Sequence, residues 1–184
     1  MKKFTLYILT AFGLMGLATS CNDFGDVNND PMNLNPGVVD YKMEFTQVEA
    51  QICGSDWDVW RNGCIYTANM IQHTASVDWA YGVFYTWNDQ YSGAYWGGFY
   101  SGGRAAIRNI IDVMNNWEGD PAYTNEYQMC RILKAYMFQN MTDLYGDVPY
   151  SEAGQGYSTN PIPYPKYDTQ EAIYDDLLKE LDEA

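Results

Sequence analysis

The chain has 184 residues, and its 10 Lys and Arg face 24 Asp and Glu, which gives a formal net charge of −14 at pH 7. Such an acidic surface repels nucleic acid phosphates, and because no basic patch interrupts it we exclude nucleic-acid binding. The length suits one domain with a real core. Aromatic residues are the compositional outlier, with 17 Tyr and 6 Trp. These rings suit both cores and wet binding surfaces, because each pairs an apolar face with a polar tip.

Residues 1–20 have the pattern of an export signal. Lys2 and Lys3 precede an apolar run from Phe4 to Leu17, and small residues follow. A bilayer span needs about 20 apolar residues, so this run is too short and we predict no transmembrane helix. The motif "LATSC" resembles a bacterial lipoprotein box, in which the thiol of Cys21 carries lipid and Cys21 becomes the first mature residue. Two or more acyl chains make such an anchor durable. A plain signal peptide with a coincidental cysteine is the alternative.

Residues 21–37 are polar, acidic and rich in turn formers, without periodicity. This composition predicts a flexible tether between the lipid anchor and a folded domain. Asp23, Asp26, Asn28 and Asp30 offer oxygens to calcium, but the EF-hand pattern is missing, so we predict no metal site and no cofactor.

The first part of the folded domain is predicted to be two helices and a loop. Apolar residues recur at helical spacing over Val38–Cys53. A second helix begins at a cap, Ser55 or Asp56, and runs to about His73. Residues 75–100 mix aromatic, glycine and turn residues without a clean period, which indicates mostly an ordered loop that leads into the next helix.

Three further helices are expected in the second part. The first covers Ala105–Trp117, and the longest begins near Pro121 and stops at "YGDVPY", where Gly146 is placed to cap it. A proline-rich extended segment follows. The last helix begins with a capping-box-like pair, Asp168 and Glu171.

The last helix, "TQEAIYDDLLKELDEA", ends on Asp182 and Glu183 without a Gly or Pro stop, and acidic residues are unfavourable at a helix C-terminus. This predicts a chain cut inside an element. Residues 38–184 are therefore expected to be the N-terminal part of a larger helical domain.

The three cysteines after Cys21 are Cys53, Cys64 and Cys130, an odd number in a compartment that permits disulfides. A disulfide between Cys53 and Cys64 is the alternative, but we favour three buried free thiols. No CxxC or Cys/His spacing indicates zinc.

No catalytic residue is predicted. His73 is the only histidine, and no G-x-S-x-G motif supplies a nucleophile. The stretch "GGFYSGGR" lacks the Lys and Ser/Thr of a phosphate loop, so close backbone packing is the better account of its glycines. Asp175 and Asp176 are adjacent on a helix and point in different directions, whereas a glycosidase needs two carboxyls that face each other across a cleft.

The segment "DWAYGVFYTWNDQY" has the composition of a saccharide site, where flat rings meet sugar C–H groups and polar side chains bind hydroxyls. The alternative is that these rings pack the loop onto the helices. Trp57, Trp60 and Trp117 lie in or beside periodic helices and are predicted to be core. The candidate ligand-binding residues are Trp79, Tyr81, Tyr85, Trp87, Asn88 and Tyr91.

The stretches "CRILKAYMFQNMTDLYGDVPYSEA" and "PKYDTQEAIYDDLLKELDEA", with the tether "FGDVNNDP" and the lipoprotein box, resemble the SusD/RagB family of outer-membrane lipoproteins from Bacteroidetes. The resemblance implies an all-α fold of tetratricopeptide-like helix pairs with long irregular loops. It also implies a lipid-anchored, cell-surface protein that captures oligosaccharides without catalysis and delivers them to a SusC-like TonB-dependent transporter. A peptide-binding member, a surface glycosidase and a purely structural subunit of the transporter complex are the alternatives.

Overall fold

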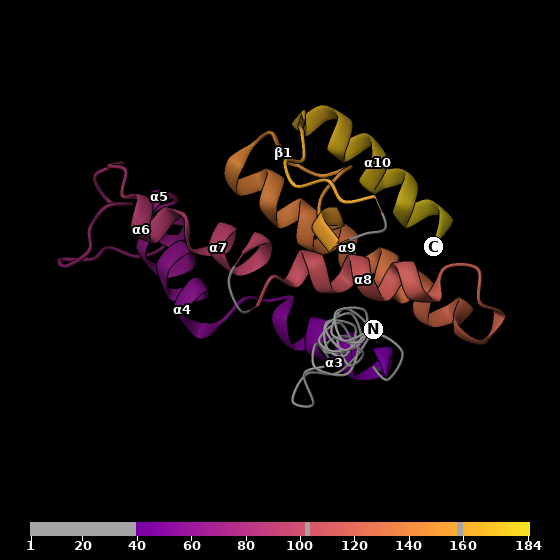
Figure 1. Cartoon of the computed structure of the whole chain (residues 1–184). Helices are drawn as coiled ribbons and strands as arrows, with labels where there is room; N and C mark the ends of the chain where they lie inside the picture. Colours follow the sequence, from indigo (N-terminus) through magenta and orange to yellow (C-terminus); the bar gives the residue numbers. More distant parts are fainter. Residues whose placement is uncertain (1–39, 102–103, 158–159) are drawn as a thin grey trace, which may run out of the picture. The chain divides into compact units, whose positions relative to one another are not determined.

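The computed structural model describes residues 40–101, 104–157 and 160–184 (Figure 1). The predicted signal peptide, the lipidation site Cys21, the tether and its oxygen-bearing residues lie outside these ranges. Within them, no helix is both long and apolar enough to cross a membrane.

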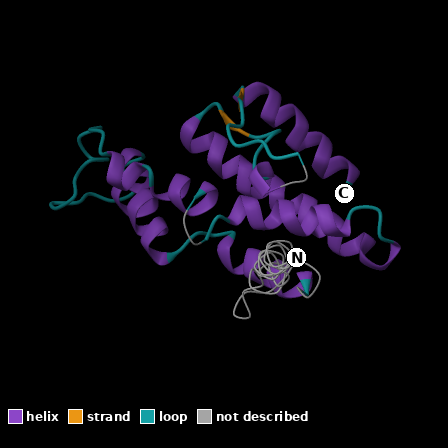
Figure 2. Ribbon diagram, in the orientation of Figure 1, coloured by secondary structure: helices purple, strands orange, loops and turns teal. Residues whose placement is uncertain are grey.

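Helices dominate the described residues, as the predicted all-α class requires (Figure 2). The strands are β1 (Val148–Pro149) and β2 (Tyr167–Asp168), which pair antiparallel with Val148 opposite Asp168. The helices are α3 (Tyr41–Gln51), α4 (Asp56–Asp58), the π-helical η1 (Val59–Thr67), α5 (Ala68–Met70), α6 (Asp89–Ser92), α7 (Ala94–Tyr100), α8 (Ala106–Trp117), the 3-10 turn η2 (Pro121–Tyr123), α9 (Thr124–Tyr145), the 3-10 turn η3 (Gln155–Tyr157) and α10 (Gln170–Glu183).

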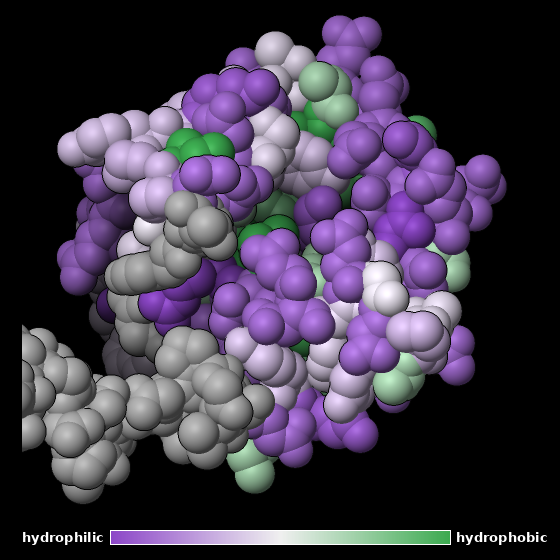
Figure 3. All heavy atoms as spheres, turned by 45° about the vertical axis from the view of Figure 1, so that its right-hand side comes forward, coloured by the Kyte–Doolittle hydropathy of each residue, from purple (hydrophilic) through white to green (hydrophobic). Residues whose placement is uncertain are grey.

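The core lies where α8 packs against α3 and α9, and where α9 in turn packs against α10 (Figure 1). This succession of packed helices agrees with the predicted helix pairs. In α8 the buried residues Ile107, Ile110, Val113 and Trp117 recur every three or four positions, so they share one face. Full burial of such a side chain contributes about 1.5–3 kcal/mol. The face shown in Figure 3 is largely hydrophilic, with a few hydrophobic residues visible between polar ones.

Two predicted helix starts had different outcomes. Ser55 does begin the second helix: its Oγ accepts from the backbone N–H of Asp58 at 3.3 Å, and the Asp58 carboxylate accepts from the Ser55 N–H at 2.9 Å. This is a complete capping box. For α10 the prediction was wrong, because the cap is Thr169. Asp168 instead accepts from the N–H and the hydroxyl of Ser151, at 2.7 and 2.8 Å.

The segment 75–100 contains more helix than predicted. The second helix ends at Met70 rather than near His73, and Gln72 follows with φ +61°. Residues 71–88 form the expected loop, here called the aromatic loop, but residues 89–92 and 94–100 are the helices α6 and α7. Their Gly93, Gly97 and Gly98 made the sequence look irregular. At the C-terminal end of α9 the predicted helix stop is confirmed, since Gly146 caps the helix with φ +75°.

All three described cysteines are free, so the Cys53–Cys64 bridge does not form. The prediction of three buried thiols was correct only for Cys130, whereas Cys53 and Cys64 are exposed. Burial, with smaller contributions from Glu126 and Glu49, raises the pKa of Cys130 to about 12.

These exposures predict the reactivity of the thiols. In the folded protein with Cys21→Ser, a maleimide is expected to label Cys53 and Cys64 readily, because both are exposed. Cys130 should stay unlabelled until denaturant is added, since it is buried and little of it is thiolate. Peptide mass spectrometry after timed labelling measures this. Labelling of Cys130 as fast as Cys53 would contradict the packing between α9 and its neighbours.

Candidate ligand-binding site

Six aromatic side chains from neighbouring segments form one connected group, called the aromatic cluster: Trp57, Trp60, Tyr66, Trp79, Tyr81 and Tyr91. Trp60 is its centre, with its ring centroid 5.3 Å from those of Trp57 and Trp79. Tyr91 lies 6.0 Å from Trp60 and 5.4 Å from Tyr81, which stacks on Tyr66 at 6.3 Å. Such ring contacts add about 0.5–1.5 kcal/mol each beyond their burial. They hold the rings in defined positions.

The second helix supplies one side of the cluster. Because residues three apart lie on the same helix face, the capping box at Ser55 places Trp57 and Trp60 side by side. From Val59 to Thr67 this helix is π-helical. Such stretches are rare and often occur at functional sites.

The aromatic loop supplies the other side. Trp79 and Tyr85 have φ values of +50° and +53°. Residues other than glycine adopt this left-handed conformation uncommonly, and it costs energy that the surrounding contacts must offset. The loop therefore holds Trp79 in a defined pose against Trp60.

Gly82 fixes the loop to the helix. Its N–H donates to the Ile65 carbonyl oxygen at 3.2 Å. A Cβ at this position would lie 2.5 Å from the Ile65 oxygen and 2.7 Å from the Tyr66 oxygen. Only glycine permits this approach of two backbones. Tyr85 adds a second attachment, since its hydroxyl donates to the Met70 carbonyl at 3.0 Å.

Buried Asn62 connects the helix to α6 and α7. With the amide oriented to satisfy its neighbours, its nitrogen donates to the carbonyls of Tyr91 and Ser92 at 3.3 and 3.1 Å, and its oxygen accepts from the Tyr95 N–H at 3.2 Å. This arrangement satisfies the buried amide. It also fixes the backbone that carries Tyr91.

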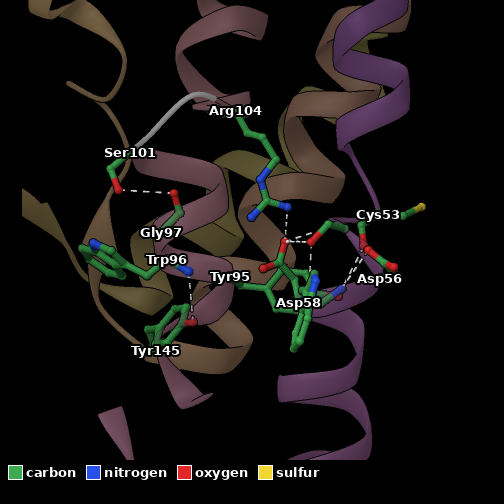
Figure 4. Close-up of polar contacts among 11 residues, drawn as sticks. Cys53, Asp56, Asp58, Tyr95, Trp96, Gly97, Ser101, Arg104 and Tyr145 are labelled. Atoms are coloured by element: carbon green, nitrogen blue, oxygen red, sulfur yellow. Dashed lines mark hydrogen bonds and ion pairs between the residues drawn. The ribbon is translucent and has the colours of Figure 1, made fainter. Parts of the chain in front are cut away.

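An ion pair joins the first turn of the same helix to Arg104 (Figure 4). The Arg104 guanidinium points at the Asp58 carboxylate, which also accepts from the Ser55 hydroxyl at 3.0 Å. Burial acts to raise the pKa of Asp58, but hydrogen bonds from Arg104 and Ser55 outweigh it and lower the pKa below its ordinary value. A Cβ on Gly98 would lie 2.9 Å from the Arg104 guanidinium, which is a side chain, so the predicted close packing of backbone does not explain this glycine.

An open hollow of about 510 Å³ lies at the exposed edge of the cluster and is lined by Asp56, Trp57, Trp60 and Trp79. Trp57 is 60% exposed and Trp79 is 52% exposed. The prediction that Trp57 belongs to the core was therefore wrong, because this helix face carries its ring outward. Trp60 is half-buried and packs within the aromatic cluster rather than in the core of α3, α8, α9 and α10. Trp117, at 3% exposure, is core as expected.

The six predicted candidates separate into two groups. Trp79, Tyr81 and Tyr91 join the aromatic cluster. Trp87 is 72% exposed and, like Tyr85, has no ring contact to the cluster among those described. Asn88 caps α6, since its side chain accepts from the Gln90 N–H at 3.1 Å. The role of its side chain is thus local, whereas its carbonyl oxygen accepts from the Tyr66 hydroxyl of the cluster at 3.4 Å.

Sequence reasoning missed Asp56, Trp57 and Trp60 as site residues. The stretch "DWDVW" directly after the cap was a usable signal, because it places two indoles on one exposed helix face beside a carboxylate. His73 is exposed at the start of the aromatic loop, outside the hollow. Among the described ranges, no group of three or more His, Cys, Asp or Glu is placed to hold a metal ion.

A sequence family described as "Starch-binding associating with outer membrane", named SusD-like, matches residues 38–184. The chain belongs to this SusD-like family. The predicted resemblance to the SusD/RagB proteins is thereby confirmed. None of the curated proteins matches the chain.

Two solved structures are similar to this SusD-like chain. One is named "chitin-binding protein"; it shares 34% identity at a TM-score of 0.64 and covers 77% of this chain. The other, "Bacteroidetes AC2a SusD-like", shares 31% identity at a TM-score of 0.63 and covers 79%. The matches span only 29% and 26% of those two proteins.

Proposed function

We propose that this SusD-like protein captures a saccharide on its aromatic cluster and delivers it to a TonB-dependent transporter of the SusC type. The observation that supports capture is the exposed hollow of Trp57, Trp60 and Trp79, beside the carboxylate of Asp56. Indole faces cover the C–H groups of a sugar ring, and a carboxylate accepts hydrogen bonds from its hydroxyls. The family description and the name of the chitin-binding neighbour point to the same class of ligand.

The rings are held before any ligand arrives. Trp60 contacts Trp57, Trp79 and Tyr91, and Gly82 and Asn62 fix the backbones on either side. A pre-formed site lowers the entropy cost of binding, because few side chains must become ordered. Such a site suits reversible capture.

A glycosidase is the less favoured alternative. Hydrolysis of a glycosidic bond uses two carboxyls that flank the bond. Within the described part of the chain, Asp56 is the single carboxylate that lines the hollow. Capture without catalysis accounts for the lining residues better.

The test is binding of glycans and peptides, side by side, to the full-length protein and two matched variants. Trp57→Ala removes an exposed ring that lines the hollow, and Trp87→Ala removes a somewhat more exposed ring outside the cluster. We expect glycan affinity to fall about tenfold in Trp57→Ala, equivalent to about 1.4 kcal/mol, and to be unchanged in Trp87→Ala. If glycan affinity fell in Trp87→Ala alone, the ligand site would lie elsewhere on the aromatic loop, near Trp87. Peptide binding without glycan binding, or shorter glycan products, would refute the proposal.

We further propose that Cys21 carries the lipid and that the protein faces the cell surface at the outer membrane. Cys21→Ser is then expected to release the protein from the membrane fraction, because the acyl chains attach through this thiol. Cys53→Ser, which removes an exposed thiol of the folded domain, is the control and should remain in the membrane fraction. Fractionation with metabolic lipid labelling measures both. Membrane attachment of Cys21→Ser would exclude this anchor.

A further inference from the structure

The hollow is open to solvent, and the rings that line it are not all parallel. The plane of Trp60 makes angles of 78° with Trp57 and 82° with Trp79. The lining rings therefore do not form one continuous face. Rings at steep angles to one another present both faces and edges to a compact group.

The chemistry of the lining favours a positive charge. Among the residues that the structure describes, Asp56 is the only lining residue besides the three tryptophans, and it is exposed. Aromatic rings attract cations through the negative potential of their faces, with Trp the strongest, and cages of such rings recognise ammonium groups. The formal net charge of −14 adds a field that attracts cations.

The cluster already holds one cation in this way. The Arg61 guanidinium carbon lies 5.3 Å from the Trp57 ring centroid and 6.0 Å from that of Tyr91. Its Nε is the one buried side-chain nitrogen or oxygen without a hydrogen-bond partner in the ranges that the structure covers. Arg61 also forms no ion pair there. The faces of Trp57 and Tyr91 thus stabilise the positive charge of Arg61, whose buried Nε has no hydrogen-bond partner.

We propose that the hollow of Asp56, Trp57, Trp60 and Trp79 binds the ammonium group of an amino sugar, so that the captured saccharide contains units with a free amine. This inference rests on the proposed saccharide capture. Asp56 forms the ion pair, and the indoles surround the ammonium group and the adjoining C–H groups. An acetylated amine would lose the charge that this lining recognises.

The test compares three oligosaccharides of equal length: glucosamine oligomers, N-acetylglucosamine oligomers and cello-oligosaccharides. Titration with tryptophan fluorescence on the full-length protein gives each affinity. We expect glucosamine oligomers to bind at least tenfold more tightly than the other two. This preference should disappear in Asp56→Asn. It should persist in Asp175→Asn, which removes the same charge from the exposed side of α10.

The outcomes separate the two proposals. Equal binding of all three oligosaccharides, weakened by Trp57→Ala, would support saccharide capture and overturn the ammonium site. The ammonium site would also be overturned if Asp56→Asn and Asp175→Asn reduced the preference for glucosamine oligomers equally, because net charge alone would then explain the preference. Binding of lysine-rich peptides but of no oligosaccharide, lost in Asp56→Asn, would overturn the saccharide assignment.

Discussion

Gly82→Ala is expected to detach the aromatic loop from the second helix. The added Cβ would lie 2.5 Å from the Ile65 carbonyl oxygen and 2.7 Å from that of Tyr66, and neither backbone atom can move aside easily. Overpacking of this kind costs about 1–3 kcal/mol. Because the loop carries Trp79 and Tyr81, their contacts with Trp60 and Tyr91 should be lost together with ligand capture. Thermal unfolding and near-ultraviolet circular dichroism measure the effect.

Gly97→Ala is the matched control. Apart from its chain neighbours and the backbone of its own helix, no described residue lies within 4 Å of a Cβ at Gly97, which is an exposed position of helix α7. Alanine is favoured over glycine in a helix by about 1 kcal/mol, so this variant should be as stable as the parent or slightly more. If Gly82→Ala unfolded at the same temperature and kept the aromatic dichroism, the loop would not be fixed at this glycine.

The second large effect is expected at the ion pair between Asp58 and Arg104. Asp58→Asn removes the charge that accepts from Arg104 and Ser55 and weakens the capping box. Loss of one partner of a fully buried pair costs about 3–5 kcal/mol. Arg104 is 37% exposed, so solvent screens its charge, and we expect about 2 kcal/mol. Asp175→Asn, at an exposed position of α10, should change the free energy of unfolding little.

The same carboxyl predicts a pH dependence. The pKa of Asp58 is lowered in the folded protein, so the unfolded chain binds its proton more readily than the folded one. The contribution of Asp58 to stability is therefore present above the ordinary Asp pKa of about 3.9 and is lost as the pH falls below it. Denaturant unfolding between neutral and strongly acidic pH measures this. The stability difference between the parent and Asp58→Asn should shrink as the pH falls through this window, and a constant difference would contradict the ion pair.

Local patterns made the helices predictable. The apolar stripe of Ala106–Trp117 and the stop at Gly146 depend on spacing and on glycine geometry, which the sequence displays directly. Asp168 and Thr169 show where this fails. Both can cap a helix, and the choice was decided by Ser151, 17 residues earlier in the chain, which engages the Asp168 carboxylate.

The site was predicted less well, because exposure depends on what packs against each helix face. Periodicity placed Trp57 and Trp60 on a helix but could not show that their face stays open. The glycine-rich helix α7 was not predicted for a similar reason. Its formation depends on tertiary contacts, such as the Tyr145 hydroxyl that accepts from the Trp96 N–H at 3.1 Å (Figure 4).

The π-helical stretch Val59–Thr67 has an evolutionary consequence. It contains Trp60, which lines the hollow, and, five and six residues further on, the buried residues Ile65 and Tyr66. Each residue turns an α-helix by about 100°, so the loss of a single residue here would rotate the hollow relative to the core by roughly that angle. One insertion or deletion between Trp60 and Ile65 would therefore re-aim the proposed ligand surface relative to these buried side chains.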